Sequence, residues 1–335
     1  MTGLGVAGLG GLGEALIKDI GKFSTQLELV AVQDVRPGVA ADMAARFGAR
    51  WAGERFEDLL AVDGLDAVLI CTPNALHAPQ AQAALRLQKH VLVQKPLAVS
   101  CVDAQATIDT AAEHGRLLFV DYSYRFLETI AVLRSRLVES GPARRAHGSF
   151  HNIYGPGAEK AWFFDPKLSG GGALMDLGVH LLDLGLWLVQ PAHARLLSVD
   201  MRSTPDRAVE SAAVLRLLLG NTEFDLDVSW NADRPSTDIT FEFQLENGSL
   251  LRWQNVDGSF FHFRTALDGE VLLDRRTTLR EDTLQAFACA LATGSGPAID
   301  TRVYTLLDQA YGRSLRAPII SPIAGSGGIP NHHPV

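Results

Sequence analysis

The sequence predicts two joined domains of different class. The first is an α/β Rossmann domain with a doubly wound parallel sheet, and the second is an α+β domain with a large, mostly antiparallel open sheet. In the first part, apolar strand patterns alternate with helical patterns. A glycine-rich turn, Gly8 to Gly13, follows the first strand. Beyond Gly141, strand patterns follow one another and are separated by turn pairs of asparagine and glycine.

The length and the composition agree with this division. With 335 residues, the chain is long for one hydrophobic core, so we expect two domains, 1–122 and 123–325, and a loose tail, 326–335. Apolar residues make up 47% of the chain and charged residues 20%. This balance is typical of a globular protein and not of a disordered one.

Charge and cysteine content argue against several classes of function. The net charge is −8, and the chain has no lysine or arginine cluster, so we expect no nucleic-acid or anionic-membrane partner. The three cysteines are far apart and form neither a disulfide framework nor a CxxC metal motif. No uninterrupted apolar run reaches the ~18 residues of a membrane span. We therefore expect a cytoplasmic protein.

The first strand and its turn predict a dinucleotide site. Residues 4–7 form an apolar strand pattern, and residues 14–20 form a helical one. Between them, G-x-G-x-x-G stands in the context that gives this motif its meaning. Its glycines allow a tight turn, close approach of a pyrophosphate and close helix–strand packing, while free N–H groups at the helix start bind the phosphates. The predicted contacts are Gly8, Leu9, Gly10, Gly11, Leu12 and Gly13.

The second strand, 27–32, leads to a carboxylate that indicates which dinucleotide binds. Asp34 lies 21 positions after Gly13, near the spacing of a residue that bonds the adenosine ribose hydroxyls. A carboxylate there repels a ribose 2′-phosphate, so NAD is favoured. Arg36 is two residues further on and is suited to such a phosphate, which keeps NADP as an alternative.

The later strands of the first domain end in polar residues. We expect strands at 66–71, 90–93 and 117–120, and helices at 39–47, 75–87 and 100–114. Ligands bind beyond the carboxyl ends of parallel strands. Asn74 is also a suitable helix cap, whereas Lys95, fixed by the following proline, is expected to project into the cofactor crevice. The predicted cofactor contacts at these strand ends are Thr72, Pro73, Asn74, His77, Gln94 and Lys95.

The second domain is predicted to hold many strands and one major helix. A helix at 129–139 leads away from the first domain. The expected strands are 144–150, 196–202, 212–219, 223–229, 238–244, 249–253 and 260–265. The major helix is 169–188, and later helices are expected at 282–293 and 301–316.

The major helix carries three ionisable residues in an apolar run. Asp176, His180 and Asp183 follow three glycines and are spaced by four and three positions, which stacks side chains on one face of an α-helix. Such groups are costly to bury unless they are paired or used. From this segment alone, two interpretations stay open: a buried helix whose polar groups bond one another, or a catalytic helix.

The motifs, in order, resemble those of the glucose–fructose oxidoreductase, inositol dehydrogenase and rhizopine-catabolism (Gfo/Idh/MocA) oxidoreductases over essentially the whole chain. Each motif is unspecific alone, but their order and spacing are specific. They are Gly8-x-Gly10-x-x-Gly13, Thr72-Pro73-Asn74 with His77, Lys95-Pro96, Tyr124-Arg125-Phe126, and Gly170-Gly171-Gly172 leading to Asp176-x-x-x-His180.

The resemblance implies NAD(P)-dependent oxidation of a sugar, polyol or related hydroxyl compound, with Lys95, Asp176 and His180 as the catalytic group. It also implies a homodimer or homotetramer formed through the second sheet. One residue departs from the family pattern: Gln94 stands where the family usually has a glutamate that bonds the nicotinamide-side ribose. A glutamine still bonds a hydroxyl but brings no charge, so the pKa of Lys95 is expected to be lower than in the usual member.

On this hypothesis each catalytic residue has a role. His180 accepts the hydroxyl proton, because imidazole titrates near neutral pH. Asp176 bonds a substrate hydroxyl or holds the imidazole, and Lys95 stabilises the developing alkoxide. Asp183 is expected to be structural and to bond backbone nearby. Weaker candidates for substrate contact are Arg125, Lys160 and Trp162.

The same residues suggest three other functions. A metal site at Asp176 and His180 lacks a third ligand, so no metal is predicted. A non-catalytic dinucleotide or sugar sensor would be expected to lose the catalytic residues, yet all three are present. A glycosidase that uses NAD for transient oxidation would release no net NADH, so an absorbance assay separates it from a dehydrogenase.

Overall fold

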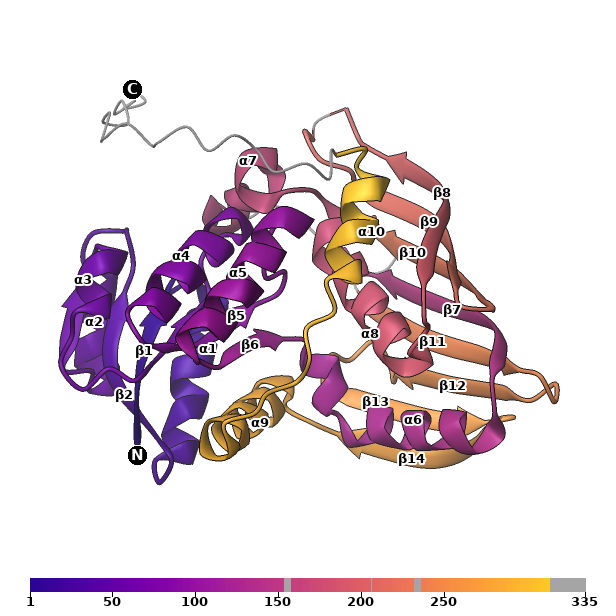
Figure 1. Ribbon diagram of the computed structural model, residues 1–335, viewed down its shortest axis with the longest axis horizontal. Helices are drawn as coiled ribbons and strands as arrows, with labels where there is room; N and C mark the ends of the chain where they lie inside the picture. Colours follow the sequence, from indigo (N-terminus) through magenta and orange to yellow (C-terminus); the bar gives the residue numbers. More distant parts are fainter. Residues whose placement is uncertain (154–157, 206, 232–235, 314–335) are drawn as a thin grey trace.

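The computed structural model describes residues 1–153, 158–205, 207–231 and 236–313. Two sheets stand apart, and helices fill the space between them (Figure 1). The predicted tail, 326–335, and the end of the last predicted helix lie outside the described residues.

The first sheet has six parallel strands in the order β3-β2-β1-β4-β5-β6. This order is doubly wound, with its reversal between β1 and β4, and it confirms the predicted Rossmann sheet. The sequence does not predict β3, because three residues are too few to show a period. The strands are β1 (Thr2–Ala7), β2 (Leu27–Gln33), β3 (Trp51–Gly53), β4 (Ala67–Ile70), β5 (His90–Gln94) and β6 (Leu118–Asp121).

Helices cover both faces of this sheet, because its strands are apolar on both sides. One face is covered by α3, α4 and α5, and the other by α1 and α2. Their bounds are α1 (Gly11–Ile20), α2 (Val39–Phe47), α3 (Phe56–Leu60), α4 (Asn74–Arg86) and α5 (Cys101–His114). The short α3 is a further element that the sequence does not predict.

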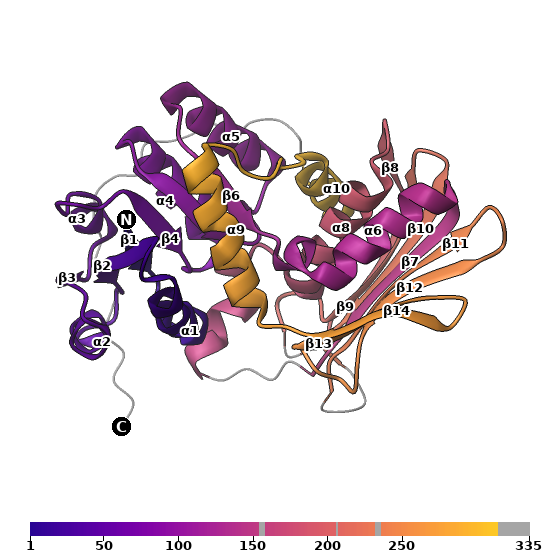
Figure 2. The same cartoon turned by 90° about the horizontal axis from the view of Figure 1, so that it is seen from below.

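A helix from the far end of the chain completes the second of these faces. α9 (Leu279–Thr293) lies over the Rossmann sheet beside α1 (Figure 2). Its Leu284 and Phe287 are fully buried in the same cluster as Leu4 and Leu16. The rings of Phe287 and Phe119 meet edge to face, with centroids 5.6 Å apart. The first core therefore includes residues from a range that the sequence assigns to the second domain.

The second sheet has eight strands in the order β14-β13-β12-β11-β7-β10-β9-β8. Only β7 and β10 are parallel among its neighbouring pairs, which confirms a mostly antiparallel sheet. The sequence does not predict β14, whose apolar residues are consecutive and do not alternate. The strands are β7 (Ala143–His151), β8 (Ala194–Arg202), β9 (Ala212–Leu219), β10 (Thr222–Ser229), β11 (Asp238–Leu245), β12 (Leu250–Asn255), β13 (His262–Leu267) and β14 (Glu270–Arg276).

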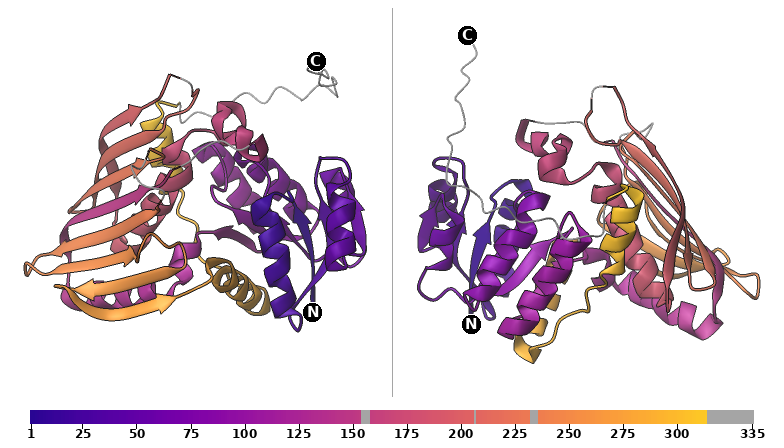
Figure 3. Two further views of the ribbon diagram at one scale, coloured as in Figure 1. Left: turned by 180° about the vertical axis from the view of Figure 1, so that it is seen from behind. Right: turned by 45° about the horizontal axis from the view of Figure 1, so that its top comes forward.

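Three helices pack on the inner face of this sheet: α6 (Glu128–Ser140), α8 (Val179–Val189) and α10 (Arg302–Ala310). Within the described residues, the outer face carries no helix (Figure 3). The helical stretch Pro166–Val189 is long and apolar enough to cross a membrane, but its most apolar window is 83% buried inside the structure. It is therefore a core helix, and it lies between the two sheets.

Candidate active site

The glycine-rich turn between β1 and α1 fits a pyrophosphate. Gly8 has a φ of +85°, and a Cβ there would lie 2.7 Å from the Cys71 backbone. A Cβ on Gly13 would lie 2.1 Å from the carbonyl oxygen of Gly8. In contrast, the space at Gly10 and Gly11 is open, and no side chain caps the start of α1. Free N–H groups and the positive end of the helix dipole therefore face a space that can hold an anion.

Asp34 follows β2 and is buried beside this turn. Its carboxylate accepts hydrogen bonds from the backbone N–H of Leu9 at 2.7 Å and from the backbone N–H, Nε and Nη2 of Arg36 at 2.9, 2.8 and 2.9 Å. Burial acts to raise the pKa of Asp34, but these bonds outweigh it and lower the pKa. A ribose hydroxyl that bonds Asp34 must therefore compete with the Arg36 guanidinium.

The polar residues after β4 form a frame that joins the two halves of the site. Pro73, and not Asn74, occupies the cap position of α4. Asn74 instead donates to the carbonyl oxygen of Ser169 at 2.8 Å, at the start of the major helix. The buried His77 ring has Nδ1 2.7 Å from the Pro96 carbonyl oxygen and Nε2 2.7 Å from that of Thr72. Burial lowers the pKa of His77, so the neutral ring donates to one of these two carbonyl oxygens while its other nitrogen faces the second. Both ring nitrogens therefore face protein groups.

Lys95 reaches from the end of β5 to the major helix. Its Nζ donates to Asp176 Oδ1 at 2.7 Å and to the Asp176 carbonyl oxygen at 2.8 Å. The indole Nε1 of Trp230 donates to the other carboxylate oxygen of Asp176 at 3.2 Å. The side chains of Lys95 and Asp176 keep 18% and 14% exposure, so the pair stays open to a small ligand.

His180 lies four residues after Asp176 on the same helical stretch, and aromatic rings surround it. Its ring packs edge to face on Tyr124, with centroids 4.9 Å apart, and lies 6.3 Å from the Phe150 ring. Its Nδ1 is buried without a hydrogen-bond partner in the described structure. Burial, and then the charge of Lys95, lower the pKa of His180 well below 6.5. The imidazole is therefore neutral at neutral pH, the form that accepts a proton.

The sequence predicts one regular α-helix over 169–188, but the stretch that carries these residues is not regular over its whole length. A short helix, α7 (Pro166–Ser169), comes first, and a π-helical turn, η4 (Leu174–Gly178), then leads into α8. Asp176 lies in the π turn. Such turns are rare and often occur at functional sites, because they change the direction of side chains along the helix.

The glycines before this helix make room for a protein carboxylate. A Cβ on Gly172 would lie 1.8 Å from the Glu210 carbonyl oxygen, and one on Gly171 would lie 2.1 Å from the Tyr311 hydroxyl. The Glu210 carboxylate accepts from the backbone N–H groups of Gly172 and Leu174 at 2.9 Å and from the Tyr311 hydroxyl at 2.7 Å. The helix start is thus bonded to a buried side chain of its own domain.

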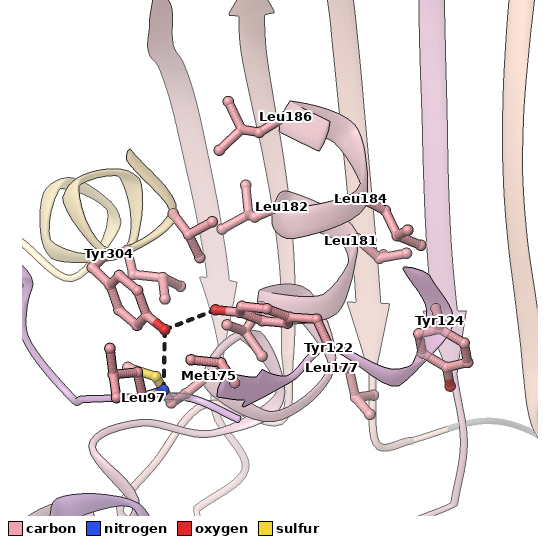
Figure 4. Packing of buried hydrophobic residues seen from close by; sticks show 14 of the residues in the cluster. Leu97, Tyr122, Tyr124, Met175, Leu177, Leu181, Leu182, Leu184, Leu186 and Tyr304 are labelled. Atoms are coloured by element: carbon pink, nitrogen blue, oxygen red, sulfur yellow. Dashed lines mark hydrogen bonds between the residues drawn. The ribbon is translucent and has the colours of Figure 1, made fainter. Parts of the chain in front are cut away.

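The turn that carries Lys95 is held from the opposite side by two tyrosines. The backbone N–H of Leu97 donates to the Tyr304 hydroxyl at 3.0 Å, and the Tyr304 and Tyr122 hydroxyls are 2.8 Å apart (Figure 4). All three residues are buried. Together with the contact between His77 and the Pro96 carbonyl oxygen, these bonds fix the backbone that follows Lys95.

Asp183 forms a second ion pair, deeper in the same helix. Its carboxylate accepts from Nε of Arg125 at 2.6 Å and from Nη2 of the same guanidinium, whose Nη1 donates to the Ala298 carbonyl oxygen. The side chains of Arg125 and Asp183 are only 4% and 1% exposed. Asp183 was expected to bond backbone, but its partner is this side chain. Arg125, a candidate for substrate contact, is held in a buried structural pair.

Comparisons with known proteins match both halves of the chain. The family model described as "Oxidoreductase family, NAD-binding Rossmann fold" matches residues 2–122, and the one described as "GFO/IDH/MocA C-terminal domain" matches residues 138–251. D-xylose 1-dehydrogenase (NADP(+)) 2 of Haloferax volcanii is 30% identical over 310 residues, which cover 88% of this chain and 91% of that protein.

The chain belongs to the Gfo/Idh/MocA oxidoreductase family.

Other relatives match over shorter stretches. Levoglucosan dehydrogenase of Pseudarthrobacter phenanthrenivorans is 30% identical over 164 residues, and the match spans 47% of this chain and 42% of that protein. A solved structure of levoglucosan dehydrogenase with NADH and levoglucosan superposes with a TM-score of 0.80 at 19% identity, over 93% of this chain and 96% of that one. At this identity, the superposition shows the shared Gfo/Idh/MocA fold.

The two remaining candidates for substrate contact lie in one short helix of this Gfo/Idh/MocA protein, η3 (Ala158–Phe164). Lys160 is exposed, and Trp162 is half-buried, with its ring 4.0 Å from that of Phe163. The ring centroids of Phe163 and Phe164 lie 6.5 and 5.8 Å from that of Trp230, and both pairs meet edge to face. The segment is therefore linked to Asp176 through Trp230, and substrate contact by Lys160 and Trp162 stays a prediction.

Several residues of the site are missed by sequence reasoning. Trp230 and Glu210 come from the strand-rich region. Trp230 is 54 positions from Asp176, and Glu210 is 36 to 38 positions from the backbone groups that it bonds, so no local pattern in the sequence indicates either residue. Asp121 carries one signal, a polar residue at the carboxyl end of a buried strand, like Asp34 and Lys95. Within the described ranges, no group of three histidine, cysteine or carboxylate side chains is arranged to hold a metal.

Proposed function

We propose that this protein is an NAD(P)-dependent oxidoreductase that transfers a hydride between a sugar, polyol or related hydroxyl compound and a nicotinamide cofactor. The observation that carries the proposal is the approach of Lys95, paired with Asp176, and of neutral His180 to the carboxyl edge of a sheet whose first turn fits a pyrophosphate. Open α/β sheets bind their ligands at this edge. Relatives named as sugar and polyol dehydrogenases, such as scyllo-inositol 2-dehydrogenase (NADP(+)) of Bacillus subtilis, support the substrate class.

The side chains suit the proton transfer that alcohol oxidation requires. Neutral His180 accepts the hydroxyl proton, and Lys95 donates a hydrogen bond to the substrate oxygen as negative charge develops there. Asp176 bonds Lys95 and Trp230, so its role is to orient the ammonium group. This differs from the alternative that Asp176 holds the imidazole. The nicotinamide, when bound, accepts the hydride.

Asp34 and Arg36 support use of either dinucleotide, with NAD favoured. With NAD, the carboxylate of Asp34 accepts hydrogen bonds from the ribose hydroxyls, and these replace one or both of the bonds from the Arg36 guanidinium. With NADP, Arg36, whose side chain is 47% exposed, can turn toward the 2′-phosphate. The relatives include enzymes named for NADP and structures that contain NADH.

The assembly and the location are proposals as well. We propose a homodimer or homotetramer through the outer face of the eight-stranded sheet, in the cytoplasm, without nucleic-acid or membrane partners. That face carries ion pairs such as Arg145–Asp225 and Arg252–Glu242, so a contact through it would be polar and sensitive to salt. Light scattering at low and high salt tests the assembly.

An NAD- and NADP-linked screen of aldoses, inositols and sugar acids tests the activity. We expect formation of NADH or NADPH with members of one of these classes. His180→Ala should lower turnover by about 10²–10⁴-fold and leave dinucleotide binding nearly intact. Dinucleotide binding without turnover of any compound would favour a sensor, and turnover of glycosides without net NADH would favour a glycosidase. Normal turnover by His180→Ala would show that another group is the base.

A further inference from the structure

A buried hydrogen-bonded network lies at the carboxyl ends of β5 and β6, next to Lys95. Gln94 and Asp121 are register partners on these neighbouring strands. Gln94 Nε2 donates to Asp121 Oδ2 at 2.6 Å, and the hydroxyl of Thr283 in α9 donates to Asp121 Oδ1 at 2.8 Å. Gln94 and Asp121 are 8% and 5% exposed, and Thr283 is fully buried. The proposed mechanism gives Asp121 no role.

Asp121 is a carboxylate without a direct ion pair. Across the residues that the structure describes, no lysine, arginine or histidine comes within salt-bridge distance of it. Burial raises the pKa of Asp121 above its ordinary value, and the bonds from Thr283 and Gln94 and the charge of Lys95 offset only part of this rise. Lys95 is thus the cation that Asp121 influences most directly.

The field of Asp121 also reaches two other groups around the site. Together with burial, which is the larger cause, it raises the pKa of Cys71 at the end of β4 and that of Tyr124 beside His180. Both groups therefore stay protonated at neutral pH. Among the described residues whose charge acts on the pKa of Asp121, Lys95 is the cation.

The Asp121 carboxylate also fixes the orientation of the Gln94 side-chain amide. Both oxygens of Asp121 accept hydrogen bonds, one from Thr283 and one from Gln94, so the amide presents its NH₂ group to Asp121. Its carbonyl oxygen, Oε1, is then the end left for another partner. Without Asp121, either end of the amide could be presented, because glutamine is both donor and acceptor.

We propose that Asp121 is a positioning residue for the cofactor and for Lys95. It holds Gln94 so that Oε1 accepts a hydrogen bond from a ribose hydroxyl of the bound dinucleotide, and it supplies negative charge beside Lys95 that a glutamine does not. In this protein the carboxylate stands on β6 and the amide on β5. The inference rests on the proposed function, because it assigns these groups to the same dinucleotide crevice.

An exchange of the two groups tests the proposal. Gln94→Glu puts two carboxylates in contact, which share one proton at low pH and repel each other once both ionise. Its affinity for NADH should fall about tenfold between pH 6 and pH 8, a trend that the parent lacks. Asp121→Asn should lose about three- to tenfold in NADH affinity without this pH trend, because the amide of Gln94 is no longer fixed. The double variant, which restores an amide–carboxylate pair, should return to within about threefold of the parent at both pH values.

Gln105 provides a matched control. Its Nε2 donates to Asp109 Oδ1 at 2.9 Å on the exposed surface of α5, so Gln105→Glu creates the same two carboxylates in solvent. This variant should bind NADH as the parent does. Fluorescence titration with NADH is the readout, and thermal unfolding at each pH identifies variants that are not folded. If Gln94→Glu does not fold, the comparison of Asp121→Asn with the double variant still decides.

The proposal is overturned if Gln94→Glu follows the pH profile of the parent, or if the double variant binds NADH no better than Asp121→Asn. Failure of the proposed function has a different signature. In that case the parent itself binds no NADH, or it binds NADH and oxidises none of the hydroxyl compounds. If the parent binds NADH and oxidises a hydroxyl compound, but the effects of the variants at positions 94 and 121 on NADH affinity are independent, only the role of Asp121 is refuted.

Discussion

Asp176 and Asp183 lie on one helical stretch, and each is paired with a cation from the part of the chain before residue 126, yet the two pairs differ in kind. The Lys95–Asp176 pair keeps 18% and 14% exposure, and Asp176 also accepts a bond from Trp230. The Arg125–Asp183 pair is 4% and 1% exposed and is bidentate. Burial raises the pKa of Asp183 to about 6 against the charge of Arg125.

The difference shows what separates a reactive ion pair from a structural one. A lysine is a compact point charge on a flexible stem, and near a surface it can release one oxygen and bond another. A planar guanidinium held by two bonds in the interior cannot move without leaving a buried charge. Residue type and exposure, more than position on the helix, therefore divide the roles of the two aspartates.

The largest expected effect separates the pairs by stability. Arg125→Met leaves the buried Asp183 carboxylate alone and should lower the free energy of unfolding by about 3–5 kcal/mol. Lys95→Met is the matched variant. It should lower the free energy of unfolding by about 1 kcal/mol, because Asp176 keeps access to solvent. Urea unfolding of the apo proteins measures both values. Equal losses in the two variants would contradict the distinction.

The second effect separates the pairs by turnover. Lys95→Met removes the donor to the reacting oxygen and should lower kcat/KM by about 10²–10³-fold. Arg125→Met, assayed at a temperature where it is folded, should stay within about tenfold of the parent. Steady-state assays with the substrate found by the screen measure this contrast. A larger loss for Arg125→Met would place Arg125 in the site.

The third effect is a pH dependence. A general base must be neutral, so activity rises as the pH passes upward through the pKa of His180. Since burial and Lys95 lower that pKa well below 6.5, the acidic limb of kcat/KM should lie below pH 6.5. Lys95→Met removes a positive charge and should move the limb to higher pH, whereas Arg125→Met should leave it in place. An acidic limb above pH 7 in the parent would contradict this assignment.

The smallest effect concerns the aromatic partner of each pair. Trp230→Phe removes one hydrogen bond to Asp176 and should lower kcat/KM by about two- to tenfold. Trp187 lies beside the buried pair, with the Arg125 guanidinium 5.7 Å from its ring centroid. Trp187→Phe should therefore leave kcat/KM unchanged. A reversed order of the two tryptophan variants would show that Asp176 does not depend on Trp230.

Local patterns in the sequence predict much of this protein. The turn from Gly8 to Gly13, the strand that ends at Asp34 and the alternation of strands and helices follow from periods and spacings within a few residues. The strands of the second sheet alternate in the same local way. Lys95 is predicted to face the cofactor crevice because it follows a strand end, and in the structure its ammonium group bonds Asp176.

The rest depends on contacts between distant parts of the chain. Nothing within a helical period distinguishes the π turn around Asp176 from a regular α-helix. The partner of Asp183 is 58 positions away, and that of Asp121 in α9 is 162 positions away. Pairings of this kind depend on the three-dimensional packing, which a single sequence does not display.

The return of α9 to the Rossmann sheet limits how the chain can be divided. Leu284, Phe287, Ala288 and Ala290 fill the sheet face that α1 and α2 leave open. A fragment ending at residue 122 would expose that apolar face to water and should aggregate or unfold when expressed alone. Co-expression with a peptide spanning Leu279–Thr293 should rescue it. The dinucleotide half of this protein is thus not an interchangeable module, because its last structural piece is synthesised after most of the other half.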